Sequence, residues 1–318
     1  MRSYGPGRPL VLSHIPKTAG TSLGAALNGL LQPDVSVLGG IDTSLWGGYD
    51  DVSALDPVLR PGIYLTPEEL PADASLVAAH LAPATTMERY PRAEHLTVLR
   101  SPQVRVLSQW MHSRSLSDFT LRRWGPSANA FRAGRRPLRE YLDEPMIAPS
   151  VDNTITRFLA WPHPALQRTG FIAEKDDDAL VDAALTRLDR FAHVNLVENP
   201  RFMADIAEWL GGPLESPQLN ERTSVLPAYR TDLATELDTD TRGHLDHRCR
   251  LDLRVWRHVA ARVLPDADHD SVLATALARA VDRYTELMSR PYDASLVRRV
   301  VERAYDVKVR LTRGAGRG

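Results

Sequence analysis

The segment that decides the fold is Pro9–Leu31, which reads PLVLSHIPKTAGTSLGAALNGLL. Its first six residues form a short apolar run that predicts a buried strand over 9–14. Residues 15–20 form a polar turn that contains Gly20, and residues 21–31 repeat leucine at helical spacing. A strand that enters a helix through a tight turn is the opening of an α/β unit. The segment therefore predicts an α/β fold.

Strand and helix patterns continue along the chain. Further apolar runs predict strands over 75–79, 95–99 and 191–197, and the first two end directly before His80 and Arg100. Residues 32–74 are rich in Gly, Pro and Asp and are predicted to be loops with short elements. Helical patterns cover residues 102–115, 152–161, 179–191, 200–210, 240–263, 270–289 and 293–311. We therefore expect one α/β domain with a central, mostly parallel sheet flanked by helices and a helical C-terminal part.

The composition is that of an ordinary globular protein. The 318 residues are 43% hydrophobic and 25% charged, with a formal net charge of −1. A nearly neutral chain is a poor electrostatic trap for nucleic acid, and no stretch approaches the ~20 apolar residues of a membrane span. The single cysteine, Cys249, excludes an internal disulfide framework and fits a reducing compartment. Because no apolar signal-peptide run precedes the first strand, we expect a cytoplasmic protein.

The chain shows no internal repeat, and we predict one domain over residues 1–318. Within it, residues 1–8 are predicted to be flexible, 116–150 to be an arginine-rich insertion and 312–318 to be a frayed tail. Only three of the 39 basic residues are lysines, a usage that indicates a GC-rich, bacterial genome. Against that background, Lys17 in the turn suggests that a compact ammonium group is needed there. The sequence predicts no oligomeric state.

Arginine is concentrated between residues 105 and 139. This stretch holds eight arginines and one acidic residue, Asp118. Such a run fits either a basic surface that meets an anionic ligand or a solvated charged face.

The turn after the first strand has the features of an anion site. Backbone N–H groups at the start of a helix lack partners within the helix, and the helix dipole favours negative charge there. Gly20 permits close approach of the anion to the backbone, Lys17 adds a charge, and Thr18, Thr21 and Ser22 add hydroxyl donors. The alternative is a polar turn with a capping hydroxyl. Lys17 precedes Gly20, so the turn does not match GxxxxGK[ST], and an ordinary ATP or GTP loop is disfavoured.

The string His14–Ser22, HIPKTAGTS, resembles the 5'-phosphosulfate-binding loop of sulfotransferases that use 3'-phosphoadenosine-5'-phosphosulfate (PAPS). It is most similar to the carbohydrate, heparan 2-O-type branch of that family. The resemblance extends over about residues 9–263 and implies a P-loop-like domain, PAPS as sulfuryl donor and 3',5'-adenosine bisphosphate as product. It also implies donor contacts from the loop residues Pro16, Lys17, Thr18, Ala19, Gly20, Thr21 and Ser22.

A second string, Leu99–Trp110, reads LRSPQVRVLSQW and resembles the family's 3'-phosphate segment. The resemblance implies that Arg100 and Ser108 hold the 3'-phosphate of PAPS. Ser101 stands where the family usually has Asp. This difference leaves both expected phosphate ligands, Arg100 and Ser108, in place but removes the side chain that is expected to hold this segment.

A third string, Val151–Leu159, reads VDNTITRFL and resembles a D-N-x-x-T-R-F-L helix of the family. Its Asn153 and Arg157 are four residues apart and share a helix face. They are candidates for contact with the acceptor or the nucleotide, and an internal hydrogen-bonded pair is the alternative. Residues 198–200 are predicted to form a helix cap, and His14 to orient the turn.

The resemblance implies two catalytic residues. Sulfuryl transfer, like phosphoryl transfer, is expected to depend on positioning and charge stabilisation. Lys17 is therefore expected to neutralise charge on the oxygen between sulfur and the leaving 5'-phosphate. His80 ends a predicted strand at the edge where ligands collect, and Ala79–Pro83 resembles the family segment that holds the catalytic base. A structural hydrogen-bonding role for His80 is the alternative, and no metal is expected because the sulfuryl group is singly charged.

The predicted activity is sulfuryl transfer to a hydroxyl of a carbohydrate, glycolipid or hydroxylated metabolite. Two other functions stay open on the sequence. One is a nucleotide-dependent kinase with a degenerate phosphate loop, which predicts Mg²⁺ dependence. The other is a non-catalytic nucleotide-binding protein on the same fold. The sequence does not identify the acceptor.

Overall fold

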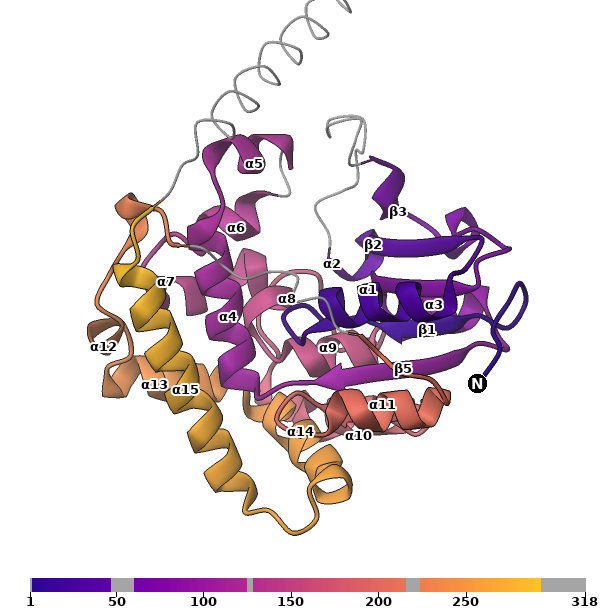
Figure 1. The fold of residues 1–318 in the computed structure, drawn as a ribbon. Helices are drawn as coiled ribbons and strands as arrows, with labels where there is room; N and C mark the ends of the chain where they lie inside the picture. Colours follow the sequence, from indigo (N-terminus) through magenta and orange to yellow (C-terminus); the bar gives the residue numbers. More distant parts are fainter. Residues whose placement is uncertain (1, 47–59, 125–127, 216–223, 293–318) are drawn as a thin grey trace, which may run out of the picture.

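The computed structural model describes residues 2–46, 60–124, 128–215 and 224–292. In that part of the chain six strands pair in parallel in the order β3-β2-β4-β1-β5-β6 (Figure 1). The strands are β1 (Leu10–Ser13), β2 (Ser36–Asp42), β3 (Ile63–Tyr64), β4 (Leu76–His80), β5 (Glu94–Leu99) and β6 (His193–Leu196). The predicted α/β fold class is confirmed.

The sheet is covered on both faces because the crossover helices leave it in opposite directions. β1 leads through α1 (Gly20–Leu31) to β2 on one side, and β4 leads through α3 (Pro83–Arg89) to β5 on the other. Leu12 and Ala78 pack with α1 and α11 (Phe202–Leu210), whereas the alternate residues, such as Val77, pack in a separate cluster with residues around α3.

A third cluster fixes the helices that follow the insertion. α9 (Thr154–Ala160), α10 (Asp177–Leu188) and α14 (Arg250–Val263) pack together around fully buried Phe158 and Trp256, and Leu99 and Leu196 at the ends of β5 and β6 join the same cluster. These helices therefore rest against the carboxyl ends of two neighbouring strands.

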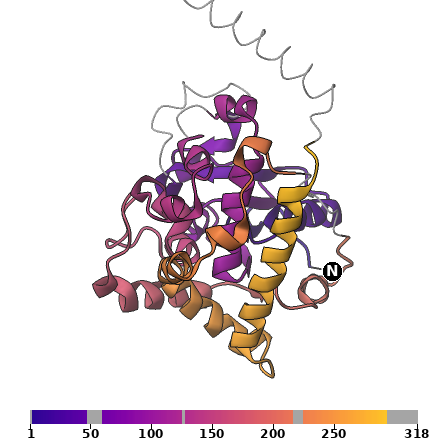
Figure 2. The same ribbon diagram turned by 90° about the vertical axis from the view of Figure 1, so that its left-hand side faces the viewer.

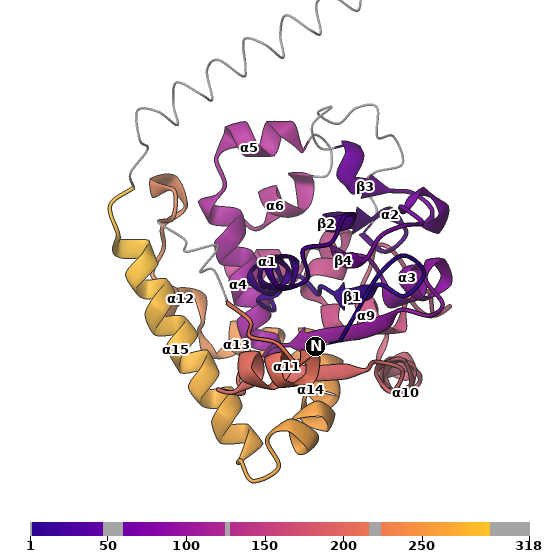
Figure 3. The same ribbon diagram turned by 45° about the vertical axis from the view of Figure 1, so that its right-hand side comes forward.

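The longest helix of the described chain, α15 (His269–Ser289), lies along α4 (Pro102–Ser115) (Figures 1 and 2). Figure 3 shows α15 on the outside of the molecule, with α13 (Thr239–Arg248) beside it. The remaining helices are short; they are α2 (Thr43–Trp46), α5 (Asp118–Arg123), α6 (Asn129–Ala133), α7 (Leu138–Leu142), α8 (Ala148–Val151) and α12 (Leu233–Glu236). None of the described helices is both long and apolar enough to cross a membrane.

Most predicted elements are confirmed, and two predictions need correction. Residues 32–74, predicted as loops with short elements, contain the strands β2 and β3. The strand character of β2 was not predicted, because Gly39 and Gly40 interrupt it and its register shifts between Leu38 and Ile41. The predicted helix over 240–263 is two helices, α13 and α14, that meet at Cys249. The predicted helix over 293–311 and the frayed tail over 312–318 lie outside the described residues.

Candidate functional site

Three neighbouring strands bring the predicted site residues to one edge of the sheet. β1 lies between β4 and β5 and pairs in parallel with both, so the carboxyl ends of all three strands meet at the same edge. β1 runs into the loop at residues 14–19, β4 ends at His80, and Arg100 follows β5. This is the edge at which open α/β sheets bind ligands.

The loop after β1 holds an unusual backbone conformation. Lys17 has φ 72° and Ala19 has φ 66°, values that non-glycine residues rarely adopt. The Thr18 hydroxyl donates to Ile15 O at 2.9 Å and ties the loop together from inside. Leu23 N–H donates to Ala19 O at 3.1 Å, so the loop leads directly into the N-terminus of α1. A helix N-terminus is a place where backbone N–H groups and the helix dipole favour an anion.

Gly20 is required by the packing of His14. A Cβ atom at residue 20 would lie 1.9 Å from His14 Cδ2, which is far inside contact distance. His14 is buried at 7% exposure, and its backbone N–H donates to Ala79 O. The predicted role of His14, to orient the turn, agrees with this contact. Because Gly20 has no side chain, the start of α1 can pack directly against the His14 ring at the end of β1.

We expect Gly20→Ala to disrupt the loop, because its methyl group and the His14 ring cannot occupy the same space. The free energy of unfolding of the variant should be lower by about 1–3 kcal/mol, the usual range for overpacking. Removing the ring in the double variant His14→Ala/Gly20→Ala should recover part of that loss in urea unfolding. If the two losses simply add, the clash is not the reason for glycine at this position.

His80 lies against His14, and its neutral ring is held in one tautomer. The two ring centroids are 4.2 Å apart, and His80 Nδ1 lies 2.7 Å from His14 O. A carbonyl oxygen only accepts hydrogen bonds, so Nδ1 carries the proton and the Nε2 lone pair is the basic position. Trp46 Nε1 donates to His80 O at 3.0 Å and fixes the backbone of the same residue.

The pKa of His80 is lowered to about 4, mainly by burial; the bond to His14 O opposes the shift, and the charge of Lys17 adds to it. Burial also holds the pKa of His14 well below its ordinary value, with the charges of His80 and Lys17 as further causes. Both imidazoles are therefore neutral at physiological pH, which is the form in which a histidine accepts a proton.

These shifts predict that the protein loses stability in acid. Between the ordinary pKa of 6.5 and about pH 4, the histidine of the unfolded chain binds a proton while His80 of the folded protein stays neutral. Unfolding therefore becomes more favourable as the pH falls through this window. Each such histidine contributes a slope of at most about 1.4 kcal/mol per pH unit. Urea unfolding across this window should show a smaller slope for His80→Gln and an unchanged slope for the exposed control His258→Gln. Equal slopes for His80→Gln and the wild type would contradict the prediction.

Arg100 joins the second predicted anion segment to the first. Its Nη1 donates to Lys17 O at 3.2 Å, so a residue after β5 contacts the loop after β1. Ser108 lies on α4, two turns into the helix, and is buried at 4% exposure. The structure thus brings Arg100 to the loop, and a contact of Ser108 with a 3'-phosphate stays a prediction.

Glu198 supplies an anchor for the Arg100 turn. Its Oε1 accepts a hydrogen bond from Ser101 N–H at 2.8 Å, and its Oε2 accepts one from Trp256 Nε1 at 3.1 Å. Burial raises the pKa of Glu198, and the two hydrogen bonds and the charge of Arg100 oppose that rise. Ser101, the N-cap residue of α4, makes no side-chain cap bond, and Glu198 binds the backbone N–H of that residue from the neighbouring strand end. The cap predicted at residues 198–200 is not the N-cap of α11, which is Arg201 and makes no side-chain cap bond; Glu198 instead fixes the turn before α4.

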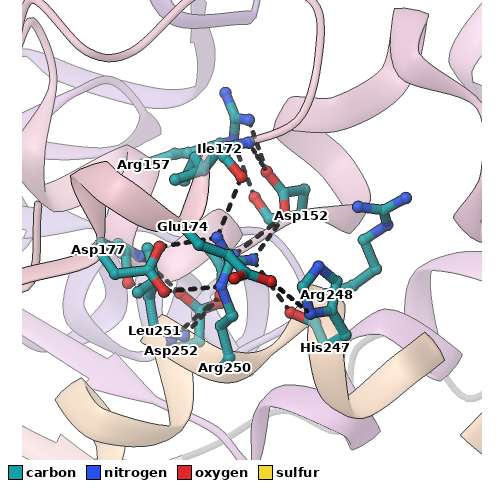
Figure 4. Close-up of polar contacts among 12 residues, drawn as sticks. Asp152, Arg157, Ile172, Glu174, Asp177, His247, Arg248, Arg250, Leu251 and Asp252 are labelled. Atoms are coloured by element: carbon teal, nitrogen blue, oxygen red, sulfur yellow. Dashed lines mark hydrogen bonds and ion pairs between the residues drawn. The ribbon is translucent and has the colours of Figure 1, made fainter. Parts of the chain in front are cut away.

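Asn153 and Arg157 lie inside the protein, at 1% and 3% exposure. They are joined through Asp152, whose Oδ1 accepts from Asn153 Nδ2 at 3.0 Å and whose Oδ2 accepts from Arg157 Nη2 at 2.6 Å. Arg157 also donates to Gly170 O at 2.8 Å. Figure 4 shows Arg157 directed at Asp152 within a larger network of charged side chains. Internal hydrogen bonds thus account for both candidates, and contact with an acceptor or nucleotide stays untested.

The same network contains a reciprocal pair of helix caps. Asn153 Oδ1 accepts from Leu251 N–H at 2.8 Å at the start of α14. In return, Asp252 of α14 accepts from Ile155 N–H at 3.0 Å and Thr156 N–H at 2.7 Å at the start of α9. Each helix therefore satisfies free donors of the other. We conclude that this exchange is what the D-N-x-x-T-R-F-L string encodes in this chain.

The arginines of residues 105–139 do not form one free basic surface. Arg105 and Arg114 are buried, and Arg114 lies over the Trp110 ring at 3.9 Å. Others in the stretch form ion pairs, namely Arg135 with Asp118, Arg136 with Glu144, and Arg139 with Asp143 and Asp240. Several of these arginines are therefore paired with acidic side chains of the protein.

The predicted site can now be compared with known proteins. No protein-family model matches the chain, and no curated protein matches it. The contacts at the sheet edge are therefore the basis on which a function is proposed.

Proposed function

We propose that the chain is a PAPS-dependent sulfotransferase that transfers a sulfuryl group to a hydroxyl of a carbohydrate, glycolipid or hydroxylated metabolite. The observation that carries the proposal is the hydrogen bond from Arg100 Nη1 to Lys17 O. It joins the two segments that resemble the 5'-phosphosulfate loop and the 3'-phosphate segment, although 83 residues separate them. A donor with phosphate groups at both ends needs two such anion-binding segments side by side.

The residues at this edge fit an in-line displacement. The N-terminus of α1 and the charge of Lys17 would hold the 5'-phosphosulfate, and Arg100 with Ser108 would hold the 3'-phosphate. His80 Nε2 would take the proton of the acceptor hydroxyl as its oxygen attacks sulfur. The bond from sulfur to the bridging oxygen breaks, and its electron pair leaves on the 5'-phosphate beside Lys17. Bound donor charge near Lys17 would raise the pKa of His80 toward the range where it acts as a base.

Calorimetry separates this proposal from the kinase alternative. We expect 3',5'-adenosine bisphosphate to bind without added metal and ATP to bind much more weakly. Arg100→Ala should weaken bisphosphate binding by about tenfold or more, the usual effect of losing a charge-assisted phosphate contact. Binding of ATP alone, and only with Mg²⁺, would overturn the sulfotransferase proposal in favour of the kinase.

Measuring turnover of PAPS distinguishes the sulfotransferase proposal from the non-catalytic alternative. The protein is incubated with PAPS and cell extract, and sulfated products are found by their mass gain. His80→Gln should bind bisphosphate normally and lose turnover by about 10²–10⁴-fold, the usual contribution of a general base. Full activity of His80→Gln would remove the base assignment. The bacterial origin and cytoplasmic location inferred from composition stay predictions beside this proposal.

A further inference from the structure

A cavity lies at the carboxyl edge of the sheet, beside the proposed donor site. Its volume is about 270 Å³, and it opens between the ends of β2 and β3, the start of α3 and the chain after α9. Among the described residues that line it are Asp42, Ser44, Tyr64, Thr85, Glu88 and Trp161.

Hydrogen bonds join the cavity floor to His80. Ile41 pairs with His80 in the sheet, and Asp42, the next residue, begins the cavity floor. Asp42 Oδ2 accepts from Ala82 N–H at 3.3 Å, two residues beyond His80. Trp46, two residues beyond the lining residue Ser44, donates from its Nε1 to His80 O. The cavity and the proposed base are therefore parts of one connected edge.

The aromatic walls of the cavity are held in place before anything binds. Trp161 Nε1 donates to Ser44 Oγ at 3.1 Å, which fixes the indole ring. The Tyr64 ring rests on Gly40, where a Cβ atom would lie 2.6 Å from Tyr64 Cε2. A preformed wall binds a ligand ring without the entropy loss of ordering flexible side chains.

The charged side chains of the cavity lining are acidic, and Arg168, outside the lining, donates from its Nε to Ser44 O at 3.2 Å. The eleven described lining residues include no arginine, lysine or histidine. Asp42 is buried, and its carboxylate accepts hydrogen bonds from Ser44, Ala82 and Thr85. Glu88 is exposed at the rim, where it would repel a carboxylate or sulfate on an incoming molecule.

We propose that this cavity is the acceptor site and that it selects an uncharged, ring-containing alcohol over a polyanionic glycan. The inference rests on the proposed sulfotransferase function. The ring would lie between Tyr64 and Trp161, and its hydroxyl would face the His80 turn.

Three acceptors test the charge selectivity with PAPS and the whole protein: naphthol for a phenolic ring, methyl glucoside for a sugar ring, and a heparosan oligosaccharide for a polyanion. We expect kcat/KM for at least one neutral acceptor to exceed that for heparosan by about tenfold or more. Glu88→Lys should narrow this gap, whereas Glu140→Lys on α7, also exposed, should leave it unchanged. Heparosan as the preferred acceptor would overturn the proposal.

A second variant tests the location. Trp161→Ala should raise KM for the neutral acceptor by about tenfold and leave KM for PAPS unchanged, and Trp161→Phe, which keeps a ring, should restore most of the affinity. An unchanged acceptor KM in Trp161→Ala would overturn the assignment of this cavity. Measuring the binding of 3',5'-adenosine bisphosphate to the wild type and to each variant distinguishes failure of the cavity assignment from failure of the sulfotransferase proposal. Intact bisphosphate binding with the wrong acceptor preference rejects the cavity alone, and no bisphosphate binding by the wild type rejects the sulfotransferase proposal.

Discussion

Replacing Lys17 with methionine is expected to lower turnover with PAPS by about 10²–10³-fold, the usual effect of removing one group that stabilises transition-state charge. Methionine keeps much of the length of the side chain and removes the ammonium. The charge on the leaving 5'-phosphate oxygen would then develop without a cation beside it. Steady-state kinetics with saturating PAPS measures the effect, and it should appear in kcat as well as in KM.

The backbone of Lys17 allows charge and strain to be separated. With φ 72°, the residue is in a conformation that glycine adopts without penalty. Lys17→Gly should therefore be as inactive as Lys17→Met while unfolding at an equal or higher urea concentration. Lys17→Arg keeps a positive charge but not its compact shape, so it should restore turnover only in part. Normal turnover in Lys17→Met would remove Lys17 from the proposed mechanism.

Replacing Asp252 with alanine is expected to destabilise the protein by about 3–5 kcal/mol, the range found when one member of a buried charged set is removed. Asp252 is 1% exposed and accepts hydrogen bonds from Ile155 N–H, Thr156 N–H and Thr156 Oγ1. It also lies near the fully buried guanidinium of Arg105, whose charge opposes the rise that burial causes in the pKa of Asp252. The variant would leave these donors without their acceptor and remove the negative charge that lies near this cation. Urea unfolding measures the loss.

An exposed aspartate gives the matched control. Asp178 pairs with Arg254 at 2.8 Å, but its side chain is 88% exposed. Asp178→Ala should therefore change the unfolding free energy by at most about 1 kcal/mol, as is usual for surface ion pairs. Similar losses in Asp178→Ala and Asp252→Ala would show that the reciprocal caps contribute little.

Sequence patterns predicted the part of the fold that local chemistry determines. The uninterrupted apolar runs predicted β1, β4, β5 and β6, and Pro102 marked the start of α4 correctly. β2 escaped prediction because a bulge at Gly39 and Gly40 breaks its alternation, and an exposed Leu38 hides its buried face. Its residues look like a loop until a neighbouring strand is present to pair with them.

Contacts between distant segments explain the other differences. α13 and α14 are separate because Asn153 lies at their junction, where its N–H donates to Arg248 O at 2.7 Å and its side chain caps α14. The sequence of 240–263 alone does not contain that partner. The cap predicted at residues 198–200 did not include the contact of Glu198 with Ser101 N–H for the same reason, since the two residues are 97 positions apart. The neighbouring positions of Lys17, His80 and Arg100 were foreseen because each follows a strand, and strand ends gather at one edge of a parallel sheet.

The two hydrogen bonds of Glu198 have a consequence for the order in which the protein is made. The chain leaves the ribosome from its N-terminus, and Arg100 and Lys17 emerge long before Trp256. A nascent chain that ends before residue 256 can form the first strands and the turn after β5, but it lacks the indole that holds one oxygen of Glu198. The edge of the sheet that we assign to the donor is therefore completed only after α14 has been synthesised, so binding competence is expected only once residue 256 has left the ribosome.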